Sequence, residues 1–112
     1  LGAPPIEKLC NALKLIDVLE WVRKADGEAP VLVSSWYRDP EYNEVIGGVP
    51  HSMHITLGAA DIVKVGWSPS DVADLMEDSP WKKQLGLGRD NSFTHVDVRG
   101  MIGRPAPARW GN

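Results

Sequence analysis

The chain has little of what marks several common protein classes. Cys10 is its single cysteine, so no intrachain disulfide can form and a metal site built from paired cysteines is excluded. The net charge is −3 and the basic residues are scattered, whereas a nucleic-acid-binding face needs clustered lysine and arginine. No apolar run is long enough to cross a membrane, and no signal-peptide pattern opens the chain. We therefore expect neither a nucleic-acid partner nor a membrane span.

The size and composition fit a small globular protein. The chain has 112 residues, of which 43% are hydrophobic and 24% are charged. We expect one domain over residues 1–112, built around a single core and acting as a monomer. Five tryptophans are many for this length. They either complete the core or line a cleft for sugars or peptides.

The first helix is predicted over residues 6–25, where apolar residues recur every three or four positions. The pattern includes Ile6, Leu9, Leu13, Ile16 and Val22, so we expect these residues to face the core. Cys10 falls on the same face, which predicts a buried and unreactive thiol.

The rest of the chain alternates strand and helix signals. Ser68-Pro69 and Asp39-Pro40 each combine a capping residue with a first-turn proline, which indicates a helix start. The tail from Gly100 is rich in glycine and proline and is expected to wrap the surface. The pattern predicts an α+β fold, with a small, mainly antiparallel sheet and helices packed on it. The expected strands are 31–35, 59–65, 86–88 and 93–98, and the later helices are 40–45 and 69–76.

Three ionisable residues in this chain suggest a metal site. Asp61 and His95 each lie within an apolar strand, where an ionised group is costly unless it is paired or bound to a metal. His54 precedes Asp61 by seven residues. Two imidazoles and one carboxylate leave a fourth position open, as a catalytic zinc requires, whereas Mg²⁺ and Ca²⁺ prefer more oxygen ligands. We expect one Zn²⁺ per chain, held by His54, Asp61 and His95. His51, which follows Gly-Val-Pro, is expected at the rim.

The same segments resemble a known family. Residues 52–61, Ser-Met-His-Ile-Thr-Leu-Gly-Ala-Ala-Asp, are similar to the S-x-H-x-x-G-x-A-x-D signature of the D-Ala-D-Ala metallopeptidases. His95-Val96-Asp97 resembles the second motif of that family, H-x-D. Residues 34–43 resemble its S-G-Y-R-S-x-x-Y-N block, with Trp36 in place of glycine. This family contains zinc carboxypeptidases, dipeptidases and phage endolysins that cut peptidoglycan stem peptides, and its fold is shared by hedgehog domains.

The resemblance implies roles for further residues. Arg38 matches an arginine that binds a substrate carboxylate or the developing oxyanion, which suits its planar fork of donors. On the other reading, Arg38 is a surface residue paired with a nearby carboxylate. Ser52 either contacts substrate or braces the loop before His54.

The sequence departs from the family pattern at two positions. Leu57 occupies the place of the signature glycine, and Gly58 follows it, so the loop is expected to turn differently. Ser92 stands where some members carry the general base three residues before the last histidine. Strand alternation is expected to place Phe93, His95 and Asp97 on one face. Asp97 and Asp90 are the available carboxylates, and Asp97 either acts as the base or orients a ligand histidine.

The expected function is a zinc peptidase acting on peptidoglycan peptides in the bacterial cell wall. Such a protein is either a phage lysin or a secreted or periplasmic enzyme. Two alternatives stay open: a zinc-retaining binding module without hydrolysis, which Ser92 favours, and a structural virion module.

Overall fold

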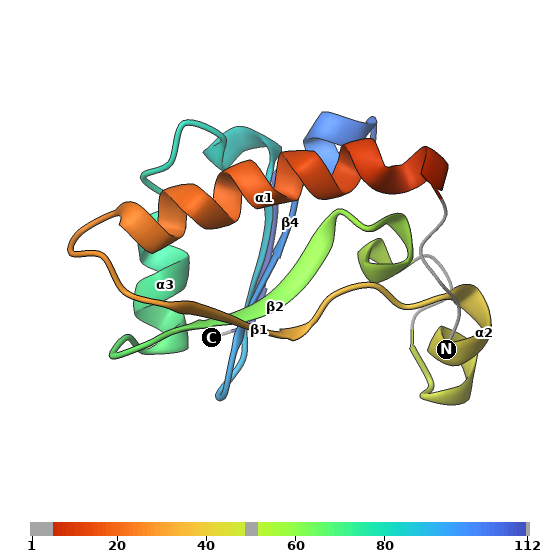
Figure 1. The fold of residues 1–112 in the computed structure, drawn as a ribbon, viewed down its shortest axis with the longest axis horizontal. Helices are drawn as coiled ribbons and strands as arrows, with labels where there is room; N and C mark the ends of the chain where they lie inside the picture. Colours follow the sequence, from red (N-terminus) through yellow and green to blue (C-terminus); the bar gives the residue numbers. More distant parts are fainter. Residues whose placement is uncertain (1–5, 49–51, 112) are drawn as a thin grey trace.

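The computed structural model describes residues 6–48 and 52–111 and has a two-layer α+β architecture, as predicted. Five strands form one sheet in the order β1-β2-β4-β3-β5. Every neighbouring pair is antiparallel except β3 and β5, which run parallel. Figure 1 shows α1 lying across the sheet beside α3, and α2 standing apart from it. The elements are η1 (Ile6–Lys8), α1 (Leu9–Lys24), β1 (Val31–Ser35), α2 (Pro40–Val45), η2 (Met53–Thr56), β2 (Ala59–Lys64), α3 (Pro69–Met76), η3 (Lys82–Gln84), β3 (Gly86–Arg89), β4 (Thr94–Asp97), η4 (Arg99–Ile102) and β5 (Ala108–Gly111).

Side chains of successive residues in β2 and β4 point to opposite faces of the sheet. Ala60 and Ile62 belong to the buried cluster that also includes residues of α1 and α3. Asp61 lies between them in the sequence and therefore points to the other face, where its partner in the register is His95. The two helices thus cover one face of the sheet and leave the ionisable residues on the other.

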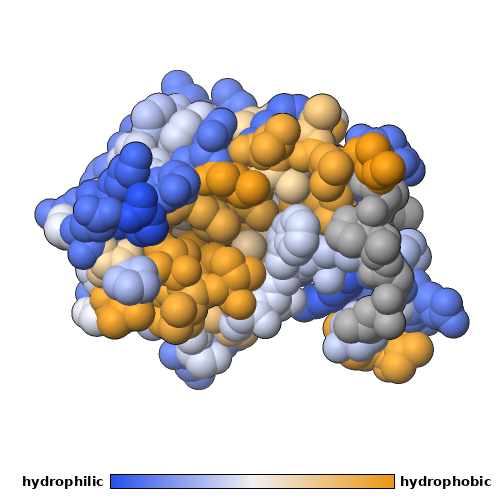
Figure 2. All heavy atoms as spheres, in the orientation of Figure 1, coloured by the Kyte–Doolittle hydropathy of each residue, from blue (hydrophilic) through white to orange (hydrophobic). Residues whose placement is uncertain are grey.

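The predicted inner face of α1 is wrong except at Val22, which is buried as expected. The helix does span the expected segment, but its buried residues are Ala12, Leu15, Val18 and Val22. Leu13 and Ile16 are 63% and 50% exposed, and Cys10 is exposed as well. The helix carries two apolar stripes, and apart from Val22 the sequence pattern identified the outer one. Figure 2 shows the resulting apolar surface along α1 and below it.

Polar contacts fix the ends of the helices as the sequence predicted. Asp39 accepts a hydrogen bond from Tyr42 N at 2.8 Å, and Ser68 accepts one from Asp71 N at 3.1 Å. Lys64 of β2 is fully buried, and its ammonium group donates to Val22 O at 2.7 Å near the end of α1. A lysine inside the core therefore joins the sheet to the carbonyl end of the helix. Among the described residues, no helix combines the length and the apolar character that crossing a bilayer demands.

The C-terminal tail adds a strand to the sheet, which the sequence did not predict. Residues Ala108–Gly111 pair in parallel with β3, so that Trp110 lies opposite Gly88. A Cβ atom at Gly88 would lie 2.3 Å from Trp110 Nε1. Glycine at this position therefore gives the indole ring room to lie against the sheet.

Candidate metal centre

The three predicted ligands meet on the helix-free face of the sheet. His54 comes from η2, Asp61 from β2 and His95 from β4. His54 Nε2 lies 3.4 Å from Asp61 Oδ1, and His95 Nδ1 lies 3.1 Å from the same oxygen. Ligands about 2.1 Å from a tetrahedral zinc are separated by roughly 3.4 Å. The spacing of these atoms therefore suits a small divalent cation.

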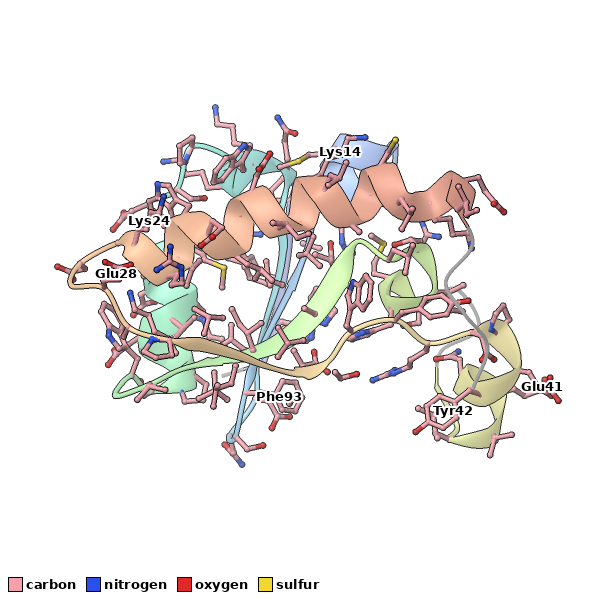
Figure 3. All side chains as sticks on the ribbon, viewed as in Figure 1. Lys14, Lys24, Glu28, Glu41, Tyr42 and Phe93 are labelled. Atoms are coloured by element: carbon pink, nitrogen blue, oxygen red, sulfur yellow. The ribbon has the colours of Figure 1, made fainter. Side chains whose placement is uncertain are left out.

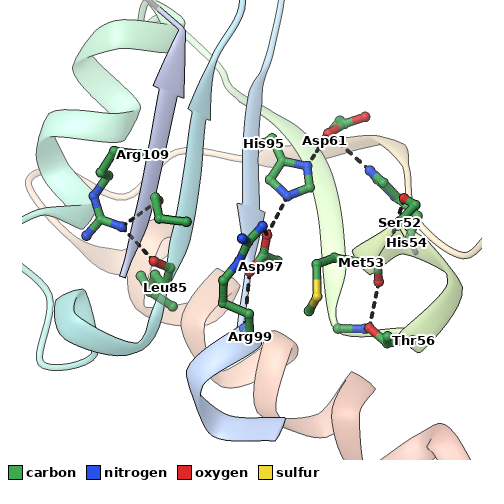
Figure 4. A network of polar contacts seen from close by, with 12 residues as sticks. Ser52, Met53, His54, Thr56, Asp61, Leu85, His95, Asp97, Arg99 and Arg109 are labelled. Carbon is green, nitrogen blue, oxygen red and sulfur yellow. Dashed lines mark hydrogen bonds and ion pairs between the residues drawn. The ribbon is translucent and has the colours of Figure 1, made fainter. Parts of the chain in front are cut away.

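The other ring nitrogen of each histidine is held by a group outside the site, and Figure 4 shows this contact for His95 and Asp97. His54 Nδ1 lies 2.6 Å from Trp36 O, and a carbonyl oxygen can only accept, so Nδ1 carries the proton. His95 Nε2 lies 2.7 Å from Asp97 Oδ2, and it donates to that carboxylate. Metal-binding histidines are oriented in this way, by a carbonyl or a carboxylate behind the ring. His54 Nε2, His95 Nδ1 and one carboxylate oxygen of Asp61 thus converge on a point that a cation can occupy.

Electrostatics at the centre follow from this arrangement. Burial opposes ionisation of Asp61, but hydrogen bonds with His54 and His95 outweigh it and lower the pKa of this carboxyl group well below its usual range. Burial alone would lower the pKa of His95, yet its contacts with Asp61 and Asp97 raise it above the usual 6.5. Without a metal, the centre therefore favours a proton where the cation would bind.

Asp97 is buried beneath the centre. Its side chain is 0% exposed, and Arg99 holds it with two parallel hydrogen bonds of 2.8 Å. These bonds, together with the one from His95, lower the pKa of Asp97 well below its usual range despite its burial. Gly86 leaves the space for this group, because a Cβ there would lie 2.4 Å from Asp97 Oδ2.

Arg38 and Ser52 both reach the cleft that contains the three ligands. This cleft has a volume of about 410 Å³. Arg38 Nη2 lies 3.9 Å from Asp61 Oδ2, and Arg38 N donates to His54 O at 3.2 Å. The Ser52 hydroxyl accepts a hydrogen bond from His54 N at 3.2 Å, so it braces η2 while also lining the cleft. His51 lies outside the described residues.

Sequence reasoning missed one feature of the cleft wall. Trp110 packs against His95, with ring centroids 5.0 Å apart, and it depends on the unpredicted strand β5. Phe93 lines the cleft together with His95, as strand alternation predicted, and lies on the side of β2 away from α1 (Figure 3). The alternation of Gly86 and Gly88 on the face of His95 was the available signal that bulky groups approach this part of the sheet.

Comparison with known families agrees with this geometry. A family model described as Peptidase M15 matches residues 3–97, which include all three candidate ligands. The chain belongs to the peptidase M15 family. Peptidases of the M15 family are metal-dependent and act on cell-wall peptides. No curated protein and no solved structure matches the chain in the corresponding searches. The resemblance to D-Ala-D-Ala metallopeptidases is thereby confirmed at the level of the family.

Proposed function

We propose that the protein is a zinc-dependent peptidase that cleaves peptidoglycan stem peptides, with one zinc ion held by His54, Asp61 and His95. The observation that carries the proposal is the convergence of His54 Nε2 and His95 Nδ1 on Asp61 Oδ1, with the other nitrogen of each ring held by Trp36 O or by Asp97. Two nitrogens and one carboxylate suit zinc better than magnesium or calcium. When bound, the zinc would polarise the scissile carbonyl and acidify a water molecule.

The side chains around the centre would bind and orient the peptide. Arg38 offers a forked donor to a substrate carboxylate or to the oxygen that gains charge as the carbonyl is attacked. Its position beside Asp61 supports this role, since it is both ordered by the site and open to the cleft. Ser52 is within the same cleft and would contact the peptide backbone while bracing η2.

The proton acceptor is better assigned to Asp90 than to Asp97. Asp97 is fully buried and engaged with Arg99 and His95, so it acts by holding His95 in place. Asp90 lines the cleft, and the Ser92 hydroxyl lies 3.4 Å from its Oδ1 as a donor. Ser92, at the expected position of the base, thus supports a neighbouring carboxylate. Asp90 would take the proton from the attacking water and pass it to the leaving amine.

The test measures zinc content and peptide hydrolysis in the same protein preparations. Zinc per chain is determined by elemental analysis, and purified peptidoglycan is digested and its products identified by mass spectrometry. We expect one zinc per chain and newly released peptide termini, with both lost in His95→Ala. Release of a single terminal residue indicates a carboxypeptidase, whereas cleavage within the peptide indicates an endopeptidase.

Two outcomes would contradict the proposal. One zinc per chain without any new termini would instead support a zinc-containing binding module. Full zinc occupancy in both His54→Ala and His95→Ala would show that the ligand assignment is wrong.

A further inference from the structure

Trp36 follows β1 and contacts the loop between His54 and Asp61 at two points. Its carbonyl oxygen lies 2.6 Å from His54 Nδ1, from which it accepts a hydrogen bond. Its indole Nε1 donates to Leu57 O at 3.0 Å. One residue therefore holds both the ring of a candidate metal ligand and the backbone further along the same loop.

The contact at Leu57 lies where the loop turns. Leu57 ends η2, and its φ of 70° is in the left-handed region, which a residue with a side chain adopts only at a cost. Trp36 and Leu57 both stand where the family pattern has glycine. These two departures from the pattern meet in the structure, through the side chain of Trp36 and the carbonyl of Leu57.

Two other side chains hold the same loop from the N-terminal helical segment. Lys8 Nζ donates to Ile55 O at 3.2 Å, and Asn11 Nδ2 donates to Thr56 O at 2.9 Å. Both of these bonds reach the loop backbone and neither involves an imidazole. Trp36 differs in that its own carbonyl also holds the ligand ring.

The Trp36 side chain combines this polar contact with an apolar environment. It is partly exposed, and it lines a groove of about 280 Å³ together with apolar residues of α1 and β1. A tryptophan in such a place buries carbon while its N–H group finds an acceptor. Any test of Trp36 must therefore separate the loss of the N–H group from the loss of ring packing.

We propose that Trp36 is a positioning residue for the metal centre. Its indole N–H group fixes the turn at Leu57, and this anchor keeps Trp36 O behind His54 Nδ1, so that Nε2 of the ring points to the cation site. The proposal rests on the metal site of the proposed function and adds a residue that acts on it through His54. Groups that orient a ligand histidine in this way change metal affinity by roughly ten- to a hundredfold when they are lost.

The test compares zinc affinity with the state of the His54 ring. Two variants remove the indole N–H group: Trp36→Phe, and replacement of Trp36 by benzothienylalanine, which keeps the bicyclic shape but has sulfur in place of N–H. We expect each to weaken zinc binding by about tenfold in competition with a chromophoric chelator, since one orienting hydrogen bond is lost. NMR of the metal-free proteins should show faster solvent exchange of the His54 Nδ1 proton than in wild type.

Two matched controls locate the effect. Trp81→Phe makes the same substitution at a tryptophan that packs against the core, so it should lower thermal stability and leave zinc affinity unchanged. Asn11→Ala removes the donor to Thr56 O but keeps Trp36, so the His54 Nδ1 proton should exchange as in wild type. Thermal melting of the metal-free proteins shows whether each variant is folded.

Three outcomes would overturn the proposal. Unchanged zinc affinity in the benzothienylalanine variant would mean that Trp36 acts by ring packing alone. Unchanged exchange of the His54 Nδ1 proton in that variant would show that the indole does not hold the ring. Equally fast exchange in Asn11→Ala would show that loosening the loop anywhere has the same effect. A wild-type protein that binds no zinc, with exchange still dependent on the indole N–H group, would contradict the zinc site and support the positioning of His54 by Trp36.

Discussion

The two faces of the sheet differ in what they contribute, although the same strands form both. One face packs into the core, and the other carries the candidate metal ligands. Toward α1 and α3, β2 presents Ala60 and Ile62, both fully buried in the core. On the opposite face it presents Asp61, which faces the two histidines. Because side chains alternate along a strand, each core residue fixes the position of a neighbouring ligand. The comparison teaches that packing on one face of the sheet positions the ligands on the other.

The largest expected effects come from substitutions at two adjacent residues of β2, one on each face of the sheet. Asp61→Ala should lose the metal and the hydrolysis that depends on it, while the metal-free fold remains. Ile62→Ala should lower the free energy of unfolding by about 2–5 kcal/mol, since it leaves a cavity in the core. Elemental analysis and urea unfolding of the metal-free proteins check both. Equal zinc occupancy in Asp61→Ala and wild type would contradict the assignment of metal binding to the face of Asp61.

Asp90→Asn tests chemistry at the rim of the ligand-bearing face. We expect turnover on the peptide substrate to fall by about a hundredfold or more, with zinc content unchanged, because the proton acceptor is lost. Steady-state kinetics and elemental analysis measure the two quantities. Unchanged turnover would exclude Asp90 as the base, and Asp71→Asn on the surface of α3 is the matched control.

Asp97→Asn should act through the metal. An amide in this position no longer pairs properly with Arg99 and His95, so zinc affinity should fall roughly ten- to a hundredfold. Competition with a chromophoric chelator measures that affinity, and activity should return in excess zinc. Activity that stays low at full zinc occupancy would instead make Asp97 the base.

Arg38→Lys should have a smaller effect. A point charge replaces a planar fork, so we expect KM for peptides with a free carboxylate to rise about tenfold while zinc binding is preserved. Peptides whose carboxylate is amidated provide the comparison. Identical kinetics for wild type, Arg38→Lys and Arg38→Ala would show that Arg38 is only a surface residue.

The pH dependence should have opposite signs for the metal-free and the zinc-bound protein. The pKa of His95 is raised above 6.5 in the metal-free fold. Protonation therefore stabilises this fold at pH below 6.5, and the gain disappears as pH rises through the raised pKa. Zinc must displace that proton, so zinc affinity should fall by up to about tenfold per pH unit below the raised pKa. Chelator competition and thermal melting between pH 5 and pH 8 measure both trends, and parallel trends would contradict the assignment.

The sequence predicted the candidate centre better than the first helix. Asp61 and His95 were recognisable because a charge inside an apolar strand needs a partner, and alternation placed Asp97 on the face of His95. Apart from Val22, the predicted core face of α1 was wrong, because Leu13 and Ile16 form a second apolar stripe beside the buried one.

The contribution of Trp110 to the cleft wall could not be predicted from the sequence, for a different reason. Trp110 reaches His95 only because residues 108–111 pair in parallel with β3. Pairing between segments about twenty residues apart depends on tertiary contacts. Neither strand has a local sequence pattern that identifies the other as its partner. The sequence offered Gly86 and Gly88 as a sign of close approach, without showing what approaches.

Leu57 has a consequence for how such sites are recognised in sequences. It stands at the signature glycine and has φ of 70°, a left-handed conformation that costs a residue with a side chain about 1–2 kcal/mol. Its side chain is 0% exposed, and burying a leucine gains about 1.5–3 kcal/mol. Burial thus offsets the backbone cost. This loop shows that leucine can adopt the left-handed conformation that glycine adopts most readily, and a motif written with glycine alone would miss such a sequence.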